Sequence, residues 1–515
     1  MNRREFIAGG AAAGMSVAMG SSFLTSCAHN QITAVKPSMA KNITAGYFAS
    51  NFGISKELIS KVLKAAVANG GDFAELFFQH KVSDFVGFED GQVNRAYAQV
   101  DLGAGIRVLK GEQTGYAFTE ELTKESLLRA AKTAGTIATG KAAGIVAPDF
   151  LEVKVPRVYS QKPMWIDIAP DEKIRIAQTI GKKITSADKR IIKASTFFGD
   201  SDEAVLIANT EGVWVEDFRP MTLIYANCAA QHNGRIETNG FSRSARNGSQ
   251  MYTEELMDTI ASEAVKRTML LFDATVPSAG EMEVVLAPAT SGILLHEAMG
   301  HGFEADFNRK KISIFSDMMN KKVAEDFVTI VDTGLENEAR GALNVDDEGT
   351  PGQRTVLVKN GKLISYLHDR ISSKFYKVKP TGSGRREDFR YIPMPRMRVT
   401  TMENGPHHPD EIIKSVKKGL YAVDFSNGEV AIGAGDYSFY VKTGYLIEDG
   451  KLTAPVKDVN LIGNGPDSLS KIVMVGNDKR IDLGTWTCGK DGQSVPVGLG
   501  LPTVKVSSIT VGGVN

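Results

Sequence analysis

The sequence has little cysteine, no excess charge of either sign and no long hydrophobic run after its first thirty residues. Its three cysteines (Cys27, Cys228 and Cys488) are too few for a disulfide framework. The 60 basic residues balance the 60 acidic ones, and because nucleic-acid-binding proteins usually carry a basic excess, no nucleic acid is expected as a partner. A membrane-spanning helix needs about 18 or more apolar residues. We therefore expect contact with a membrane only through an N-terminal anchor.

The composition is that of a folded protein with more than one domain. Hydrophobic residues make up 42% and charged residues 23% of the 515 positions, an ordinary globular balance. At roughly 100–200 residues per domain, this length allows two or three domains. Proline and glycine interrupt the pattern at 273–280, so we expect an N-terminal α+β domain over 46–275 and a mostly antiparallel β domain over 276–515. The predicted fold class is α+β, with the chemistry in the second domain.

The first 27 residues resemble an export signal. Arg3-Arg4 precedes a weakly hydrophobic stretch rich in Ala and Gly, as in twin-arginine signals. The stretch ends in Leu-Thr-Ser-Cys at 24–27, which is similar to a bacterial lipobox, so we expect cleavage before Cys27 and lipid on its thiol. Residues 28–45 would form a polar tether. The expected location is the periplasm, as a membrane-anchored lipoprotein; an uncleaved N-terminal anchor is the alternative.

Hydrophobic periodicity predicts the main elements. Apolar residues at helical spacing predict helices over 55–68, 123–137, 170–190, 254–271, 290–303 and 409–419. Short runs of strand character, separated by turn signals, predict N-terminal strands over 74–80, 84–89, 93–100, 103–109, 113–119, 192–198, 204–209, 213–218 and 221–231.

The segment 290–303 carries a metal-ligand pattern. Two histidines, His296 and His301, flank Glu297 in an HExxxH arrangement. The common zinc motif HExxH places its ligands four apart on one helix face. A spacing of five puts the second histidine about 140° from the first on an ideal α-helix, so both reach one metal only if the helix widens into a π-type turn. Gly300 makes that distortion easier. Two structural histidines in a buried helix are the alternative.

A second pattern lies near the C-terminus, where Cys488 stands in a glycine-rich run that we expect to be an exposed loop. Two histidines and one thiolate form a known catalytic zinc set with an open fourth position. The alternative is a cysteine buried as a small hydrophobic residue.

Five motifs together resemble the TldD/PmbA family of metallopeptidases. They are HEAMGHGFEAD (296–306), DDEGTPGQ (346–353), TGSGRRE (381–387), PMPRM (393–397) and TCGKDGQSVPVGLGLPT (487–503). The resemblance implies a TldD-type catalytic member with one Zn²⁺ per chain held by His296, His301 and Cys488. It also implies flexible or unfolded peptides as substrates, and a homodimer or a heterodimer with a PmbA-type subunit. The export signal departs from that family, which is usually cytoplasmic.

The expected mechanism assigns roles to several side chains. Glu297 is the general base toward a metal-activated water. Glu304 or Asp306 would orient a ligand histidine, with helix capping or a surface ion pair as the alternative. Arg385, Arg386 and His408 are candidate substrate contacts, and a structural ion pair is the alternative for the arginines. Extended peptides would bind by strand addition, with the glycine-containing segment 430–441 beside the cleft.

Two other functions fit the same residues. One is a zinc amidohydrolase that acts on modified or cell-wall peptides. The other is a lipid-anchored, non-catalytic subunit with a structural metal, which an intact Glu297 disfavours because a structural site needs no base.

Overall fold

The computed structural model describes residues 46–140, 149–160 and 164–513, which belong to one compact unit. The predicted export signal with Cys27 and the predicted tether lie outside the described residues. Within the described ranges, no helix is both long and apolar enough to cross a lipid bilayer.

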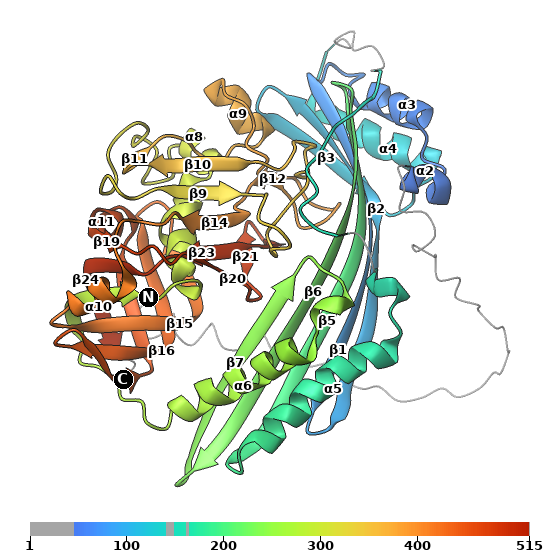
Figure 1. Cartoon of the computed structure of the whole chain (residues 1–515). Coiled ribbons are helices and arrows are strands. Elements are labelled where there is room, and N and C mark those ends of the chain that lie inside the picture. The colour runs from blue at the N-terminus through green and yellow to red at the C-terminus, as the bar shows by residue number, and fades with distance from the viewer. Residues whose placement is uncertain (1–45, 141–148, 161–163, 514–515) are drawn as a thin grey trace, which may run out of the picture. The chain divides into compact units, whose positions relative to one another are not determined.

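A long twisted sheet dominates the first half of the chain (Figure 1). Its strands run in the order β3-β2-β1-β5-β6, and β4 and β7 both pair with β6. Their bounds are β1 Phe73–Glu89, β2 Gln92–Lys110, β3 Gln113–Thr119, β4 Leu151–Glu152, β5 Ile191–Asn209, β6 Val213–His232 and β7 Arg235–Ala245. Every pairing is antiparallel except that of β4 with β6.

The prediction of short strands is wrong here, because eight of the expected segments merge into four strands of 17 to 20 residues. Pro220 is one misleading signal. It pairs with Asp202 of β5 in the middle of β6. On its other side β6 pairs with β7 only from Thr222 onward. A proline is tolerated in a strand where its missing N–H would have no ladder partner.

The helices lie close to their predicted positions. The N-terminal half contains α2 Tyr47–Phe52, α3 Lys56–Ala66, α4 Lys124–Ala134, α5 Pro170–Ala187 and α6 Glu254–Leu270. Ser55, Thr123 and Thr253 cap α3, α4 and α6, each accepting a hydrogen bond from the backbone N–H three residues on. Helices α5 and α6 pack along one end of the long sheet (Figure 1).

The two faces of β1 bind different parts of the molecule, because successive side chains of a strand point to opposite faces. On one face, Phe78 packs against Phe48 of α2 and Asp84 pairs with Lys173 of α5. The other face packs against the C-terminal half, where Phe77 contacts residues 345 and 389.

A buried ion network strengthens this second contact. Arg107 of β2 lies 2.8 Å from Glu75 and 2.6 Å from Glu348, and Arg386 lies 2.7 Å from Glu75. Removing one partner would leave a buried charge without compensation. Two of the family-like motifs, at 346–353 and 381–387, therefore hold the long sheet against the second half of the chain.

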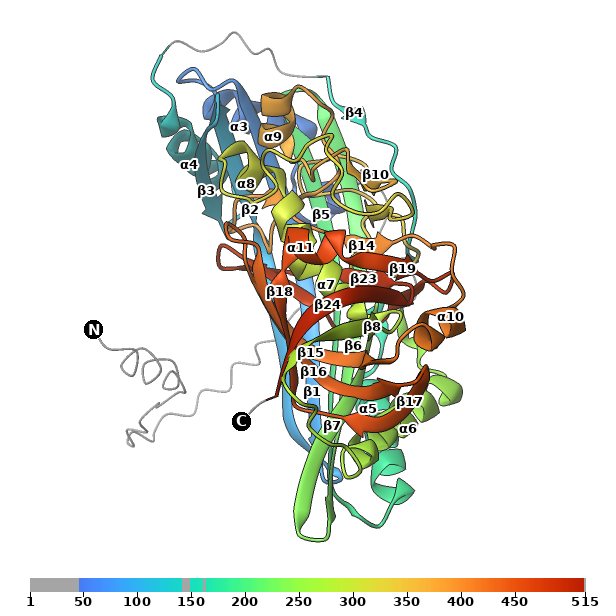
Figure 2. The same cartoon turned by 90° about the vertical axis from the view of Figure 1, so that its left-hand side faces the viewer.

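The C-terminal half is mostly antiparallel β structure, as predicted. Five strands close into a barrel in which β15 pairs with β8 and β16, β24 with β8 and β18, and β16 with β18. Their bounds are β8 Gly280–Leu286, β15 Lys418–Ala431, β16 Asp436–Glu448, β18 Val459–Asn464 and β24 Val504–Gly513. Strands β17 Lys451–Val456 and β19 Ile472–Val475 extend it (Figure 2).

A second sheet lies beside the barrel. It consists of β11 Lys362–Leu363, β10 Arg354–Lys359, β9 Ile330–Thr333, β14 Val399–Met402, β23 Gly498–Leu501 and β20 Arg480–Asp482, in this spatial order. Two further antiparallel pairs form hairpins. They are β12 Gly384–Arg385 with β13 Met394–Pro395, and β21 Thr487–Lys490 with β22 Gln493–Pro496. The short helices are α8 Ala305–Arg309, α9 Arg370–Tyr376, α10 Pro409–Lys414 and α11 Gly465–Ser470. Helix α10 is shorter than predicted because β15 begins at Lys418.

Candidate metal centre

The histidine motif lies on a distorted helix in the core of the C-terminal half. After β8, a short 3₁₀ turn (Thr290–Gly292) leads into α7 (Ile293–Leu295), then a π turn (His296–Gly300) and a final 3₁₀ turn (His301–Phe303). The π turn required by the five-residue spacing is therefore confirmed. It brings the centroids of the His296 and His301 rings to 5.0 Å.

Gly300 permits this turn by lacking a side chain. A Cβ atom at this position would lie 2.0 Å from the Met397 sulfur, which is far inside contact distance. The turn thus packs directly against the PMPRM motif. Any other residue at 300 would force the Met397 side chain or the turn itself to shift.

Cys488 reaches the histidines from the β21–β22 hairpin, whose turn at Asp491-Gly492 has two residues with positive φ. The prediction of an exposed loop is wrong, because Cys488 lies on a strand and is 2% exposed. Arg396 Nη2 donates a 2.6 Å hydrogen bond to the Cys488 carbonyl and so fixes the hairpin. Cys488 Sγ lies 3.4 Å from His301 Nε2.

These three side chains form a compact, buried donor set. One ligand atom from each of His296, His301 and Cys488 lies within 4.8 Å of the others. His296 Nδ1 is buried and has no hydrogen-bond partner among the described residues. Two imidazoles and a thiol that meet in this way fit a zinc ion, which takes nitrogen and sulfur ligands.

A carboxylate and an ammonium group orient His301. Glu304 Oε2 lies 3.0 Å from His301 Nδ1 and 3.0 Å from Lys490 Nζ. Burial alone would raise the pKa of Glu304, but Lys490 and His301 lower it to about 2. An ionised Glu304 accepts a hydrogen bond from His301 Nδ1–H, which would leave Nε2, on the side of Cys488, to bind a metal ion. Asp306, the other predicted orienting residue, instead pairs with Lys490 at 2.8 Å.

The electrostatics of the donor set favour a thiolate. Burial opposes ionisation of Cys488, but the two histidines hold its pKa well below the usual range. Burial would also lower the pKa of His301, but Glu304 and the cysteine raise it well above its usual value. Cysteine binds metals as the thiolate, and a metal ion bound here would displace the extra proton that the raised pKa lets His301 hold.

Glu297 lies on the π turn beside the donor set. Its Oε2 is 3.9 Å from His301 Nε2, and its side chain is 17% exposed, more than the buried His296 and Cys488. Burial raises the pKa of Glu297, although the two histidines oppose that rise. A carboxylate with a raised pKa next to a metal site suits proton transfer near neutral pH.

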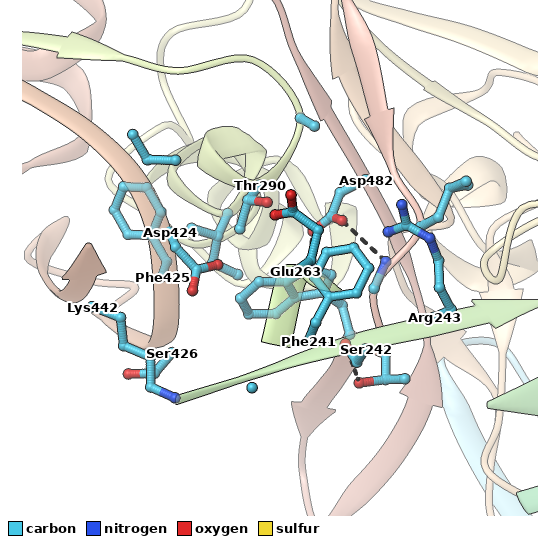
Figure 3. A pocket seen from close by; sticks show the side chains of 18 of the residues that line it. Phe241, Ser242, Arg243, Glu263, Thr290, Asp424, Phe425, Ser426, Lys442 and Asp482 are labelled. Atoms are coloured by element: carbon cyan, nitrogen blue, oxygen red, sulfur yellow. Dashed lines mark hydrogen bonds between the residues drawn. The ribbon is translucent and has the colours of Figure 1, made fainter. Parts of the chain in front are cut away.

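A cavity of about 900 Å³ opens in front of His296 and Glu297 (Figure 3). Figure 3 shows Asp424, Phe425 and Lys442 on one side and Arg243 on the other. Some of its walls come from the N-terminal half, from β7 and α6, and others from β15, β16 and β20. The cavity is therefore built by residues from both halves of the chain.

Two strand edges border the cavity. Strand β15 pairs with β8 only as far as Ala422, and its residues at 423–426 and Gly428 line the cavity. Strand β20 is the last of its sheet, and residues 480–484 line the same space. The prediction that segment 430–441 lies beside the cleft is thus wrong by a few residues, since Gly433 and Gly435 pack near Ile312 and Ile314.

The three predicted substrate contacts lie elsewhere. His408 caps α10, accepting a hydrogen bond from the Asp410 backbone N–H, and its side chain is 60% exposed. The guanidinium of Arg386 pairs with Glu75, and that of Arg385 donates to the carbonyls of Met397 and Pro496. None of the three lines the metal cavity. For Arg386 the structural ion pair, the alternative in the sequence analysis, is the contact observed.

Sequence reasoning missed the cavity walls. Arg243 on β7 and Arg267 on α6 both contact the Phe241 ring, at 4.4 and 4.7 Å from its centroid. Arg267 also pairs with Asp424 at 2.8 Å. Their local sequence is that of an ordinary amphipathic helix and strand, so no local signal marks them; only the packing of the two halves brings them to the site.

Three family models match consecutive parts of the chain. Residues 74–138 match PmbA/TldA metallopeptidase domain 1, residues 164–272 match the central domain, and residues 279–513 match the C-terminal domain.

Named relatives cover most of the chain. The metalloprotease TldD homolog of Haemophilus influenzae is 38% identical over 451 residues, covering 86% of this chain and 93% of the relative. The zinc metalloprotease TldD homolog of Saccharolobus solfataricus is 26% identical over 460 residues, covering 88% and 99%.

Solved structures agree in fold. A protein described as a putative modulator of a DNA gyrase, from Thermotoga maritima, has a TM-score of 0.71 at 20% identity and covers 89% of this chain and 100% of its own. TldE from Thermococcus kodakarensis has a TM-score of 0.69 at 16% identity, with coverage of 88% and 100%. At these identities the likeness concerns the fold alone.

Proposed function

Since this chain belongs to the PmbA/TldD family of metallopeptidases, we propose that it is a zinc-dependent peptidase of flexible or unfolded peptides. One Zn²⁺ per chain is held by His296, His301 and Cys488, and Glu297 is the general base. The observation that carries this proposal is the meeting of three buried ligand atoms, within 4.8 Å of one another, where His296 and the carboxylate of Glu297 line a large cavity.

The metal and the protein side chains divide the reaction between them. When bound, zinc supplies a Lewis acid that polarises the scissile carbonyl and makes a water molecule more acidic. Glu297 accepts the proton of the attacking water and delivers it to the leaving amine, a transfer that its raised pKa favours. Glu304 keeps His301 in the tautomer and orientation that the metal needs.

The open strand edges support an extended peptide as substrate. A peptide laid against β15 beyond Ala422, or against β20, would be bound through its backbone N–H and C=O groups. Such binding tolerates varied side chains but requires an unfolded segment. The breadth of the cavity and its mixed walls of Phe241, Arg243 and Asp424 fit loose sequence preference.

Removal of the metal is expected to stop peptide cleavage. The full chain, purified with its metal, should contain about one zinc ion and cleave a reduced, carboxymethylated protein but not its folded form. A zinc chelator should lower the cleavage rate by at least about 100-fold, and added Zn²⁺ should restore it, because the Lewis acid is lost and regained. Metal analysis measures the zinc content, and a peptide-release assay measures the cleavage rate.

The outcomes separate the competing functions. Hydrolysis of non-peptide amides without hydrolysis of peptides would favour the amidohydrolase. A zinc-loaded chain that cleaves only after a PmbA-type subunit is added would identify the active form as a heterodimer. A chain that binds no zinc would contradict the proposed centre.

We further propose that the chain is exported by the twin-arginine route and anchored in the periplasm through lipid on Cys27. The support is the order of Arg3-Arg4, a small-residue apolar stretch and the Cys27 motif. Cys27→Ala is expected to move the protein from the membrane fraction to the soluble fraction, and Arg3→Lys with Arg4→Lys to keep it inside the cell. Unchanged fractionation of both variants would contradict the proposal.

A further inference from the structure

A second cavity, of about 240 Å³, lies between the long sheet and the C-terminal half. Strands β1, β5 and β6 form one wall, with Phe77, Ser83 and Arg219 among the lining residues. Glu387 and Ser494 also line it and are exposed, so the cavity opens to solvent. Thr487, the residue before Cys488, lines both this cavity and the metal cavity.

Three arginines line this space without an acidic partner among the described residues: Arg246, Arg340 and Arg385. Arg385 donates only to the carbonyls of Met397 and Pro496, at 2.5 and 2.8 Å. Arg340 donates to the Trp486 carbonyl at 2.9 Å and to the hydroxyls of Ser244 and Thr487, and contacts the Met221 sulfur.

Arg246 is the least satisfied of the three. It is 4% exposed, and in the described part of the chain its Nε is buried without a hydrogen-bond partner. Its contact is with the ring of Tyr159, whose centroid lies 5.3 Å away. Burying a cation without a hydrogen-bonding partner is unfavourable. A bound ligand that offers a hydrogen-bond acceptor would therefore stabilise this guanidinium.

The carboxylates that line the cavity have other partners. Asp347 lies 2.7 Å from Arg219 and accepts the Arg386 backbone N–H, Asp200 pairs with Lys173 at 2.8 Å, and Glu387 accepts the Ser494 N–H. Glu203 accepts from Gln79. None of these acids forms an ion pair with Arg246, Arg340 or Arg385.

The electrostatics agree with this geometry. Burial lowers the pKa of Arg246, and burial lowers that of Arg385 to about 9 and that of Arg340 to about 10. Arg246 adds to the effect on both neighbours by repulsion, while Asp347 opposes it at Arg385 and Glu203 and Asp217 oppose it at Arg246. All three arginines line the same cavity. An anion between them would remove this repulsion.

We propose that this second cavity binds a peptide carboxylate, with Arg246 as its main ligand and Arg340 and Arg385 beside it. A guanidinium presents parallel N–H donors that match the two oxygens of a carboxylate. The volume admits a short peptide end rather than a whole peptide. Under the function proposed above, a carboxylate held here would tether a peptide beside the hairpin that carries Cys488.

The test is direct binding to the full chain in the Glu297→Gln background, in which hydrolysis is expected to be slow, both with zinc and after zinc removal. The probes are N-acetyl-alanyl-alanine and the same dipeptide as its C-terminal amide. Calorimetry should detect binding of the acid in both metal states and at least tenfold weaker binding of the amide. Arg246→Gln should weaken binding of the acid at least tenfold, since a charge-assisted hydrogen bond is lost. Arg129→Gln, at an exposed helix position, should change nothing.

A stability measurement separates a binding role from a structural one. Without ligand, Arg246→Gln should unfold at the same temperature as the parent or higher, because a buried charge without a partner is removed. N-acetyl-aspartyl-amide carries only a side-chain carboxylate and so tests which carboxylate the site binds. Binding as tight as that of N-acetyl-alanyl-alanine would assign the site to any peptide carboxylate. Weaker binding would assign it to the C-terminal carboxylate. Equal binding of acid and amide, or full binding by Arg246→Gln, would overturn the proposal. Neither result depends on whether the chain cleaves peptides.

Discussion

Glu297→Gln is expected to lower the rate of peptide hydrolysis by about 10²- to 10⁴-fold while the zinc content stays that of the parent. Glutamine has nearly the same shape, but it cannot accept a proton from the attacking water. The nearest charged contact of Glu297 is His301, at 3.9 Å, so the substitution removes no close ion pair and should leave the fold intact. Initial rates on an unfolded protein substrate and metal analysis of the same preparation measure the two effects.

Glu263→Gln is the matched control. Glu263 lines the same cavity on α6, and it lies near Arg267 rather than near the histidines. It should keep most of the parent's kcat. A Glu297→Gln variant that retains the parent's kcat, or that loses its zinc, would show that this carboxylate is not the base.

Cys488→Ser is expected to weaken zinc binding by at least about 100-fold, since even residues that only orient a ligand change metal affinity by 10- to 100-fold. A serine hydroxyl stays protonated at neutral pH and is a poor zinc ligand, whereas the two histidines hold Cys488 as a thiolate. Competition with a chromophoric zinc chelator gives the affinity, and peptide hydrolysis should fall in parallel.

Cys228→Ala controls for the loss of a buried sulfur. Cys228 lies on β6 in the core under α5 and α6, fully buried and far in the fold from the metal centre. This variant should lose some stability through the cavity it creates and still bind zinc like the parent. If Cys488→Ser bound zinc as tightly as the parent, the proposed ligand set would be wrong.

Local signals allowed part of this structure to be predicted. Capping residues such as Ser55 and Thr253 marked helix starts correctly, because a cap acts within one turn. The HExxxH spacing predicted the π turn at His296–Gly300, because two rings one residue too far apart can face one metal only in that way. Both inferences depend on geometry that neighbouring residues determine.

Other features depend on contacts between distant segments, which no local pattern reveals. Glycines around Cys488 suggested an exposed loop, but they flank a buried hairpin that Arg396 fixes. Arg385 and Arg386 were predicted to contact substrate, and they are buried between the two halves of the chain, away from the metal cavity. The cavity walls on β7 and α6 border the site only because the two halves of the chain pack together.

The separation of the ligands along the chain has a consequence for folding. His301 and Cys488 are 187 residues apart, and β24, which pairs with both β8 and β18, follows the cysteine. Closing such a long loop costs conformational entropy, so we expect these contacts to form late in folding, after the barrel strands have paired. The donor set therefore exists only in the completed fold. Partly folded chains present an isolated histidine pair or an isolated thiol, and neither alone is a tight zinc site. Under the proposed function, a chain would therefore gain peptidase activity only after it has finished folding.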